Sequence, residues 1–148
     1  MSEIASNVAT LQLQGDERHI QSAIDALALL PRSRWQQGER SRRGGVHGSS
    51  GCSTIVADAS NPVAMTDQIR RLLLTCQRLA YDFPALGLQA ELSIALSIGN
   101  AAQYVAAVDW SAADLRLIGG CGINLSVTAF PTSDDAAAED DPLQDFWR

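Results

Sequence analysis

Three segments of this chain alternate between apolar and polar side chains, and this alternation limits the possible folds more than any other feature. It is clearest in residues 91–98, where leucine and isoleucine alternate with polar or small residues. Residues 8–14 and 122–130 follow the same pattern. Successive side chains of a strand point to opposite faces of a sheet, so an alternating strand buries only one face. We therefore predict a sheet with one apolar and one polar face.

A sheet of this kind needs helices on one side only. A doubly wound parallel sheet has helices on both faces, and its strands are continuously apolar. The sequence instead predicts an α+β fold, a two-layer sandwich with a mainly antiparallel or mixed sheet of four strands and all helices on one face. The fourth strand is a short apolar segment at residues 52–57. The expected order of elements is β-α-β-α-β-α-β.

Helical spacing of apolar residues and local stop signals define three helices, which we expect at residues 16–31, 61–82 and 111–119. Pro31 cannot continue the first helix. The second helix begins at Asn61, which precedes a proline suited to the first turn. Ser111 and Asp114 resemble a capping box at the start of the third. Residues 31–51 are predicted to form a long loop, and residues 99–110 fit either strand or helix.

The size and charge of the chain indicate one domain with an acidic tail. Its 148 residues match the usual length of one domain. We assign residues 1–133 to a single α+β domain and residues 134–148 to an acidic C-terminal tail. The tail holds six acidic residues and one arginine, so it accounts for five of the six net negative charges. The rest of the chain is nearly neutral.

Several classes of protein are not supported by the sequence. No apolar run is long enough to cross a membrane, and the first residues lack the features of a signal peptide, so we expect a cytoplasmic protein. The three cysteines are widely spaced and suit buried, reduced thiols. Neither they nor the two histidines form a metal-binding pattern, and no cofactor is expected. A net charge of −6 argues against nucleic-acid binding.

Catalytic motifs are also missing, so we expect a protein that is not an enzyme. Ser49 and Ser50 lie close to His47 in the sequence, but the G-x-S-x-G pattern of a nucleophile elbow is missing. The glycines around His47 match neither the phosphate-binding loop of NTPases nor the dinucleotide-binding pattern. No catalytic residue is assigned.

The first candidate binding segment is the predicted loop at residues 31–51. Five arginines surround Trp35 there, namely Arg32, Arg34, Arg40, Arg42 and Arg43. Arginine forks bind phosphates and carboxylates, and a tryptophan can anchor a protein interface. The alternative is a solvated loop in which Trp35 caps the core and the arginines pair with Glu39 and the tail.

The acidic tail is the second candidate. It combines acidic residues such as Asp140 and Asp141 with the large apolar residues Phe146 and Trp147. Segments of this composition are typical of docking onto a basic surface. The alternatives are a frayed terminus or a strap that folds back on the arginine-rich loop.

Several short motifs resemble a family of uncharacterised bacterial proteins, the domain of unknown function four-two-seven-nine. The resemblance covers residues 8–130. Its most specific part is the turn after the first helix, which joins Trp35 to Gly38 and Glu39; the other motifs are Gln14-Gly15-Asp16, Leu30-Pro31 and Ala113-Asp114-Leu115. The resemblance implies no known activity. It implies that such proteins are often encoded beside secreted toxins and are similar to their immunity partners.

These observations lead to two main hypotheses of function. The first is a non-catalytic protein-binding module, an immunity protein that neutralises a toxin, for which a basic protein is expected, by binding it directly through anchors such as Trp35, Tyr104 or Trp147. The second is a small ligand-binding domain or enzyme that acts on a phosphorylated metabolite through the arginine-rich loop. A homodimer formed by pairing of edge strands is a third possibility.

Overall fold

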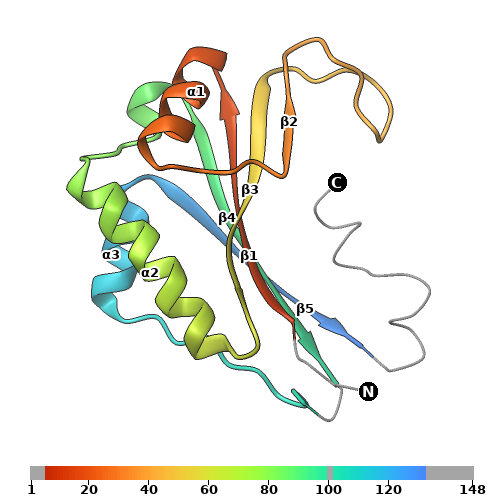
Figure 1. The fold of residues 1–148 in the computed structure, drawn as a ribbon, viewed down its shortest axis with the longest axis vertical. Coiled ribbons are helices and arrows are strands. Elements are labelled where there is room, and N and C mark those ends of the chain that lie inside the picture. Colours follow the sequence, from red (N-terminus) through yellow and green to blue (C-terminus); the bar gives the residue numbers. More distant parts are fainter. Residues whose placement is uncertain (1–5, 100–101, 133–148) are drawn as a thin grey trace.

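A computed structural model describes residues 6–99 and 102–132, and these form an α+β fold with one open mixed sheet (Figure 1). The five strands are β1 (Asn7–Gly15), β2 (Ser33–Trp35), β3 (Ser50–Ala59), β4 (Gln89–Ile98) and β5 (Ile123–Pro131). The helices are α1 (Glu17–Ala26), α2 (Pro62–Arg78) and α3 (Ala112–Gly120), with a 3-10 turn, η1 (Pro84–Leu86). The predicted tail residues lie outside the described residues.

The strands lie in the order β2-β3-β1-β4-β5. All neighbours are antiparallel except β4 and β5, which run parallel. The predicted α+β class and mixed sheet are confirmed, but the expected number of four strands is wrong. The extra strand, β2, falls inside the predicted loop. Three residues are too few to show an alternating pattern, and β2 forms because it pairs with β3 from Ser33↔Ser53 to Trp35↔Gly51.

The three helices pack on one face of the sheet, as the alternating strands predicted (Figure 1). Leu11 and Leu13 of β1 and Leu92 and Ile94 of β4 are buried against them. The helices contribute their own apolar residues to this core, which include Ile20, Ile69, Leu73, Cys76 and Ile118. The other face carries the polar positions of the same strands, and it is therefore the face on which a polar site can form.

Local signals set the starts of the helices. The side chain of Asn61 accepts a hydrogen bond from the backbone N–H of Ala64 at 2.8 Å. Ser111 and Asp114 form the predicted capping box, in which each side chain accepts a hydrogen bond from the other's backbone N–H. These contacts satisfy backbone donors that the first turn of a helix leaves unpaired.

Two of the predicted helix ends are wrong. The first helix ends at Ala26, before Pro31, because Ala28 adopts a positive φ of 53° and the N–H of Leu29 donates to the carbonyl of Ile24 at 2.9 Å. The second ends at Arg78 in the same manner, with Ala80 at a φ of 57°. These ends use alanine where glycine is usual, so the sequence carries no signal for them.

The ambiguous segment before α3 forms neither helix nor strand over its described residues, 102–110. It is held by Gln103, which is buried and exchanges side-chain hydrogen bonds with Asn7 of β1. The amide of Gln103 donates to Oδ1 of Asn7 at 2.7 Å, and the amide of Asn7 donates back at 3.2 Å. No helix among the described residues has the length and apolarity needed to span a membrane.

Candidate functional site

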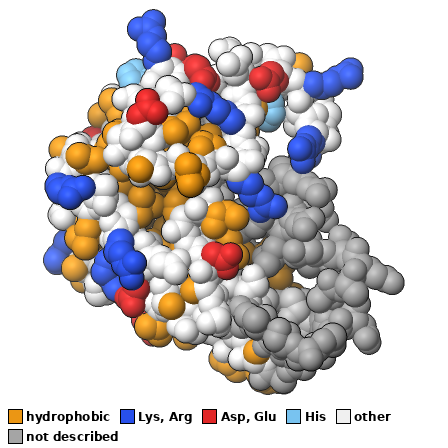
Figure 2. Space-filling view, viewed as in Figure 1, with side chains coloured by type: hydrophobic (Ala, Val, Ile, Leu, Met, Phe, Trp, Pro, Cys, Tyr) orange, Lys and Arg blue, Asp and Glu red, His pale blue; other side chains and the backbone are white. Residues whose placement is uncertain are grey.

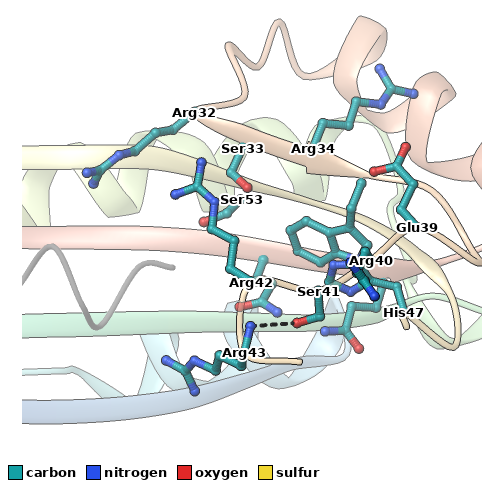
Figure 3. Close-up of a pocket in the computed structure, with 13 residues that line it drawn as sticks. Arg32, Ser33, Arg34, Glu39, Arg40, Ser41, Arg42, Arg43, His47 and Ser53 are labelled. Atoms are coloured by element: carbon teal, nitrogen blue, oxygen red, sulfur yellow. Dashed lines mark hydrogen bonds between the residues drawn. The ribbon is translucent and has the colours of Figure 1, made fainter. Parts of the chain in front are cut away.

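The main cavity lies on the face of the sheet that the helices leave uncovered (Figure 3). Its volume is about 750 Å³. Its floor is formed by the polar positions of three neighbouring strands, namely Gln12 and Gln14 of β1, Ser33 and Trp35 of β2, and Ser53 of β3. The remaining lining residues are Arg32, just before β2, Arg34 within β2, and residues of the segment between β2 and β3. We call this feature the Arg cavity, because arginines are its most frequent lining residues.

The segment between β2 and β3, which was predicted as part of a long loop, is a hairpin held by backbone hydrogen bonds. The backbone N–H of Gly38 donates to the carbonyl of His47 at 2.9 Å, and the N–H of His47 donates to Glu39 at 2.8 Å. Near the tip the N–H of Ser41 donates to Gly45 at 3.0 Å. Gly44 and Gly45 have φ values of 94° and 74°, which suit glycine in a tight turn. This hairpin places Arg42 and Arg43 at its tip.

Trp35 joins the hairpin to the sheet. Its ring stacks on the ring of His47, with centroids 5.1 Å apart and an angle of 21° between the planes. The same ring lies directly over Gly51 of β3, where an added Cβ would come within 2.3 Å of Trp35 Cζ2. Gly51 is therefore required for the ring to lie flat on the strand. Trp35 is half-buried in this position, so part of its ring is available for contact.

Arg34 lines the cavity with the other predicted arginines but differs from them in its ion pair. Arg34 pairs with Cys52 in the sheet, which directs its side chain to the helical side, and there it forms an ion pair with Glu17. In Figure 3 Arg32 and Arg34 extend in opposite directions from the start of β2. The prediction that Arg34 binds a partner together with the other arginines stays a prediction, and the ion pair with Glu17 is the feature that sets Arg34 apart.

The other four arginines also line the cavity. Arg32, Arg40 and Arg42 are exposed and form no ion pair within the described residues, and the backbone N–H of Arg43 donates to Ser41 Oγ at 3.2 Å. Glu39 is the one carboxylate in the lining. Figure 2 shows basic side chains gathered around the hairpin, at the upper right. The Arg cavity is therefore a cationic hollow in a chain whose net charge is −6.

Several lining residues were not predicted. Gln12 and Gln14 could have been found, because the alternation of β1 places them together on the polar face. Ser33 and Ser53 could not, because their position depends on the pairing of β2 with β3. Of the other predicted residues, Tyr104 is 78% exposed and does not line this cavity, while Asp140, Asp141, Phe146 and Trp147 lie outside the described residues.

The lining groups suit binding better than nucleophilic chemistry. His47 stacks on Trp35, and Ser50 Oγ accepts a hydrogen bond from the backbone N–H of Gln37 at 3.1 Å, so both have structural contacts. Guanidinium groups bind carboxylates and phosphates in a bidentate manner. Among residues 6–99 and 102–132 no group of three His, Cys, Asp or Glu side chains is placed to hold a metal ion.

The three cysteines lie away from the Arg cavity and are free and buried, as predicted. Burial raises the pKa of the Cys76 thiol to about 12 and also raises the pKa values of Cys52 and Cys121. Cys121 lines a second hollow of about 570 Å³ between α2 and α3, together with apolar residues such as Leu74 and Leu117. A thiol with a raised pKa is a poor nucleophile near neutral pH.

Comparison with known proteins adds no relative. No family model, no curated protein and no solved structure matches this chain. The resemblance to the domain of unknown function four-two-seven-nine therefore stays a prediction, and the argument for function depends on the Arg cavity.

Proposed function

We propose that this protein is a non-catalytic protein-binding module that binds an acidic segment of a partner protein in the Arg cavity. The observation that carries this proposal is the set of three exposed arginines, Arg32, Arg40 and Arg42, which have no ion-pair partner within the described residues and surround a half-buried tryptophan. Arginine and tryptophan are the residues most enriched among the strong anchors of protein interfaces.

The lining of the cavity favours a polypeptide over a small molecule. Pockets for small ligands are mostly apolar, with only a few polar groups that fix the orientation of the ligand. The Arg cavity has the opposite composition, since Trp35 is its one large apolar residue among serines, glutamines and charged side chains. An extended acidic segment can place one carboxylate after another against the arginines, while its backbone meets the serine and glutamine side chains.

Binding of an acidic peptide tests this proposal. We expect a fluorescein-labelled glutamate-rich peptide to bind, by fluorescence anisotropy, and a glutamine-rich peptide of the same length to bind far more weakly. Replacing two cavity arginines, Arg40→Gln with Arg42→Gln, removes charge-assisted hydrogen bonds. We expect at least a tenfold loss of affinity, which corresponds to about 1.4 kcal/mol.

The matched control is the pair Arg18→Gln and Arg71→Gln. Both arginines are exposed, neither forms an ion pair within residues 6–99 and 102–132, and neither lines the Arg cavity. This variant has the same net charge as the cavity variant, so its affinity should stay close to that of the wild type. An equal loss in both variants would show non-specific attraction and would reject the Arg cavity as the binding site.

The partner is not identified by the cavity. A role as an immunity protein stays a prediction, supported by the family resemblance and the acidic tail. The described residues contain ten acidic and ten basic side chains, so they add no net charge that would attract a basic toxin. Rescue of growth when this protein is produced together with a toxin encoded beside it would support this role. Failure of the two proteins to bind each other would remove that toxin as the partner.

The volume of the cavity favours a second candidate, a phosphorylated small molecule. Small-ligand pockets range from about 300 to 1,000 Å³, and the Arg cavity falls within this range. A ligand at a hundred times its dissociation constant adds about 2.7 kcal/mol to the free energy of unfolding. A thermal-shift screen of nucleotides, sugar phosphates and inorganic phosphate would detect such a ligand, and a uniform absence of shifts would reject this candidate.

A further inference from the structure

The two edges of the sheet differ in a way that the Arg cavity does not explain. At one edge β2 is three residues long, contains Arg34 and follows Arg32. At the other edge β5 is nine residues long, and none of its residues is charged. Proteins usually protect an edge strand by making it short or by placing charges on it, because its unpaired backbone groups can pair with another chain. The edge at β2 has this protection, and within residues 6–99 and 102–132 the edge at β5 lacks it.

The side chains of β5 are also those of an interface. Leu125, Val127 and Ala129 lie opposite Leu92, Ile94 and Leu96 of β4, so they are on the apolar, helical side of the sheet. The β4 residues are buried, whereas Leu125 is 36% exposed and Val127 is 49% exposed. The apolar face of the sheet therefore continues to its edge without being covered by the described residues.

We infer that β5 pairs with the β5 strand of a second copy of this chain, in antiparallel orientation across a two-fold axis at Val127. In this register Val127 lies beside its own counterpart and Leu125 beside Ala129, on the apolar face. On the other face Ser126 lies beside Thr128. Pairs of β-branched residues and Ser–Thr pairs are favourable across antiparallel strands, and no like charges meet. The sequence of β5 is thus complementary to itself, as a two-fold interface requires.

The dimer joins the two five-stranded sheets into one continuous sheet and pairs the outer backbone groups around Val127 with those of the second copy. A strand edge alone buries less than the roughly 1,600 Å² of a standard stable interface, so we expect a dimer that dissociates on dilution. The Arg cavities lie over β1, β3 and β2, and β4 separates them from the β5 edges, so both stay accessible. Dimerisation and binding of an acidic segment are therefore independent properties.

The test is the mass of the full-length chain in solution, measured by sedimentation equilibrium at micromolar and at submillimolar concentration. We expect a mass near twice 15.8 kDa at the higher concentration. Val127→Lys places two like charges at the two-fold axis and should give a monomer. Val63→Lys is the matched control, because Val63 is 69% exposed on α2, away from β5, and this variant should dimerise like the wild type.

A mixing experiment tests the register. Val127→Lys and Val127→Glu should each be monomeric, and an equimolar mixture should form a heterodimer, because only a two-fold axis at Val127 brings these two residues together. Circular dichroism of each variant confirms folding. A wild-type monomer at submillimolar concentration would overturn the inference, as would a folded Val127→Lys variant that still dimerises. Failure of the mixture to form a heterodimer would overturn the register.

Discussion

At the scale of single residues, a bidentate ion pair joins α2 to α3. The guanidinium of Arg70 donates two hydrogen bonds to the carboxylate of Asp114, from Nε to Oδ1 at 2.8 Å and from Nη2 to Oδ2 at 2.9 Å. Asp114 is buried and also accepts from the backbone N–H of Ser111. The hydrogen bonds from Arg70 are the main reason that the pKa of Asp114 lies well below its usual range. One side chain therefore both caps α3 and fixes it to α2.

This contact predicts a loss of stability in acid. A carboxyl group whose pKa is lowered by folding stabilises the folded state above its unfolded pKa of about 3.9, and this contribution is lost as the pH falls below that value. Asp114→Asn removes the charge at every pH. We expect this variant to have a lower melting temperature at pH 7 and a smaller decrease between pH 7 and pH 3 than the wild type, by circular dichroism. An unchanged decrease would contradict the assigned role of Asp114.

At the scale of elements, the contact between Trp35 and Gly51 decides whether the hairpin docks on the sheet. Trp35 ends β2, Gly51 lies opposite it on β3, and the ring of Trp35 in turn holds His47 of the hairpin. The added Cβ of an alanine at position 51 would also lie 2.8 Å from the carbonyl oxygen of Leu13. Neither the ring nor the strand backbone can move away without loss of other contacts. The shape of the Arg cavity therefore depends on this glycine.

We expect Gly51→Ala to lower the free energy of unfolding by about 1 to 3 kcal/mol, the usual cost of overpacking. It should also weaken binding of the acidic peptide, because the hairpin arginines are displaced with Trp35. Gly48→Ala is the control, since Gly48 has no atom within 4 Å of an added Cβ and no positive φ. Urea denaturation of both variants makes the comparison. Equal stabilities would show that the ring is free to shift.

The same elements show how far the sequence predicts the site. The arginines and Trp35 were recognised from their clustering, and Gln12 and Gln14 lie on a face that alternation identifies. The ion pair that distinguishes Arg34 from the other arginines was not predictable. It depends on which residue of β2 pairs with Gly51. A shift of one residue in that register would exchange the two faces. Short strands of polar residues carry too little pattern to set their own register.

At the scale of the whole molecule, the distribution of charge matters more than its sum. The described residues are neutral overall, while five of their ten arginines line one cavity. Both the Arg cavity and the β5 edge arise from the same architecture. The helices cover one face of an open sheet, whose two edge strands are β2 and β5. One chain thereby offers a cationic surface and an uncharged edge, separated by the width of the sheet.

The charge of the cavity predicts that binding of the acidic peptide depends on salt. Arg32, Arg40 and Arg42 are exposed, so dissolved ions weaken the attraction between their charges and the peptide. The Debye length, beyond which such attraction is largely screened, is about 10 Å at 0.1 M salt. We expect the affinity, measured by anisotropy, to fall severalfold between low and physiological ionic strength. The fall should be smaller in the variant with Arg40→Gln and Arg42→Gln. An affinity that does not change with salt would argue against ion pairing.

The sequence by itself determined the side of the sheet that the helices cover. Alternation along a strand places its apolar side chains on one face, and that face must be buried. It also determined the starts of α2 and α3, whose caps lie within a few residues of the groups they satisfy. Only the tertiary structure decided the strand order, the docking of the hairpin through Trp35 and Gly51, and the exposure of Val127 at an edge. Each of these depends on contacts between residues far apart in the chain, which no local pattern records.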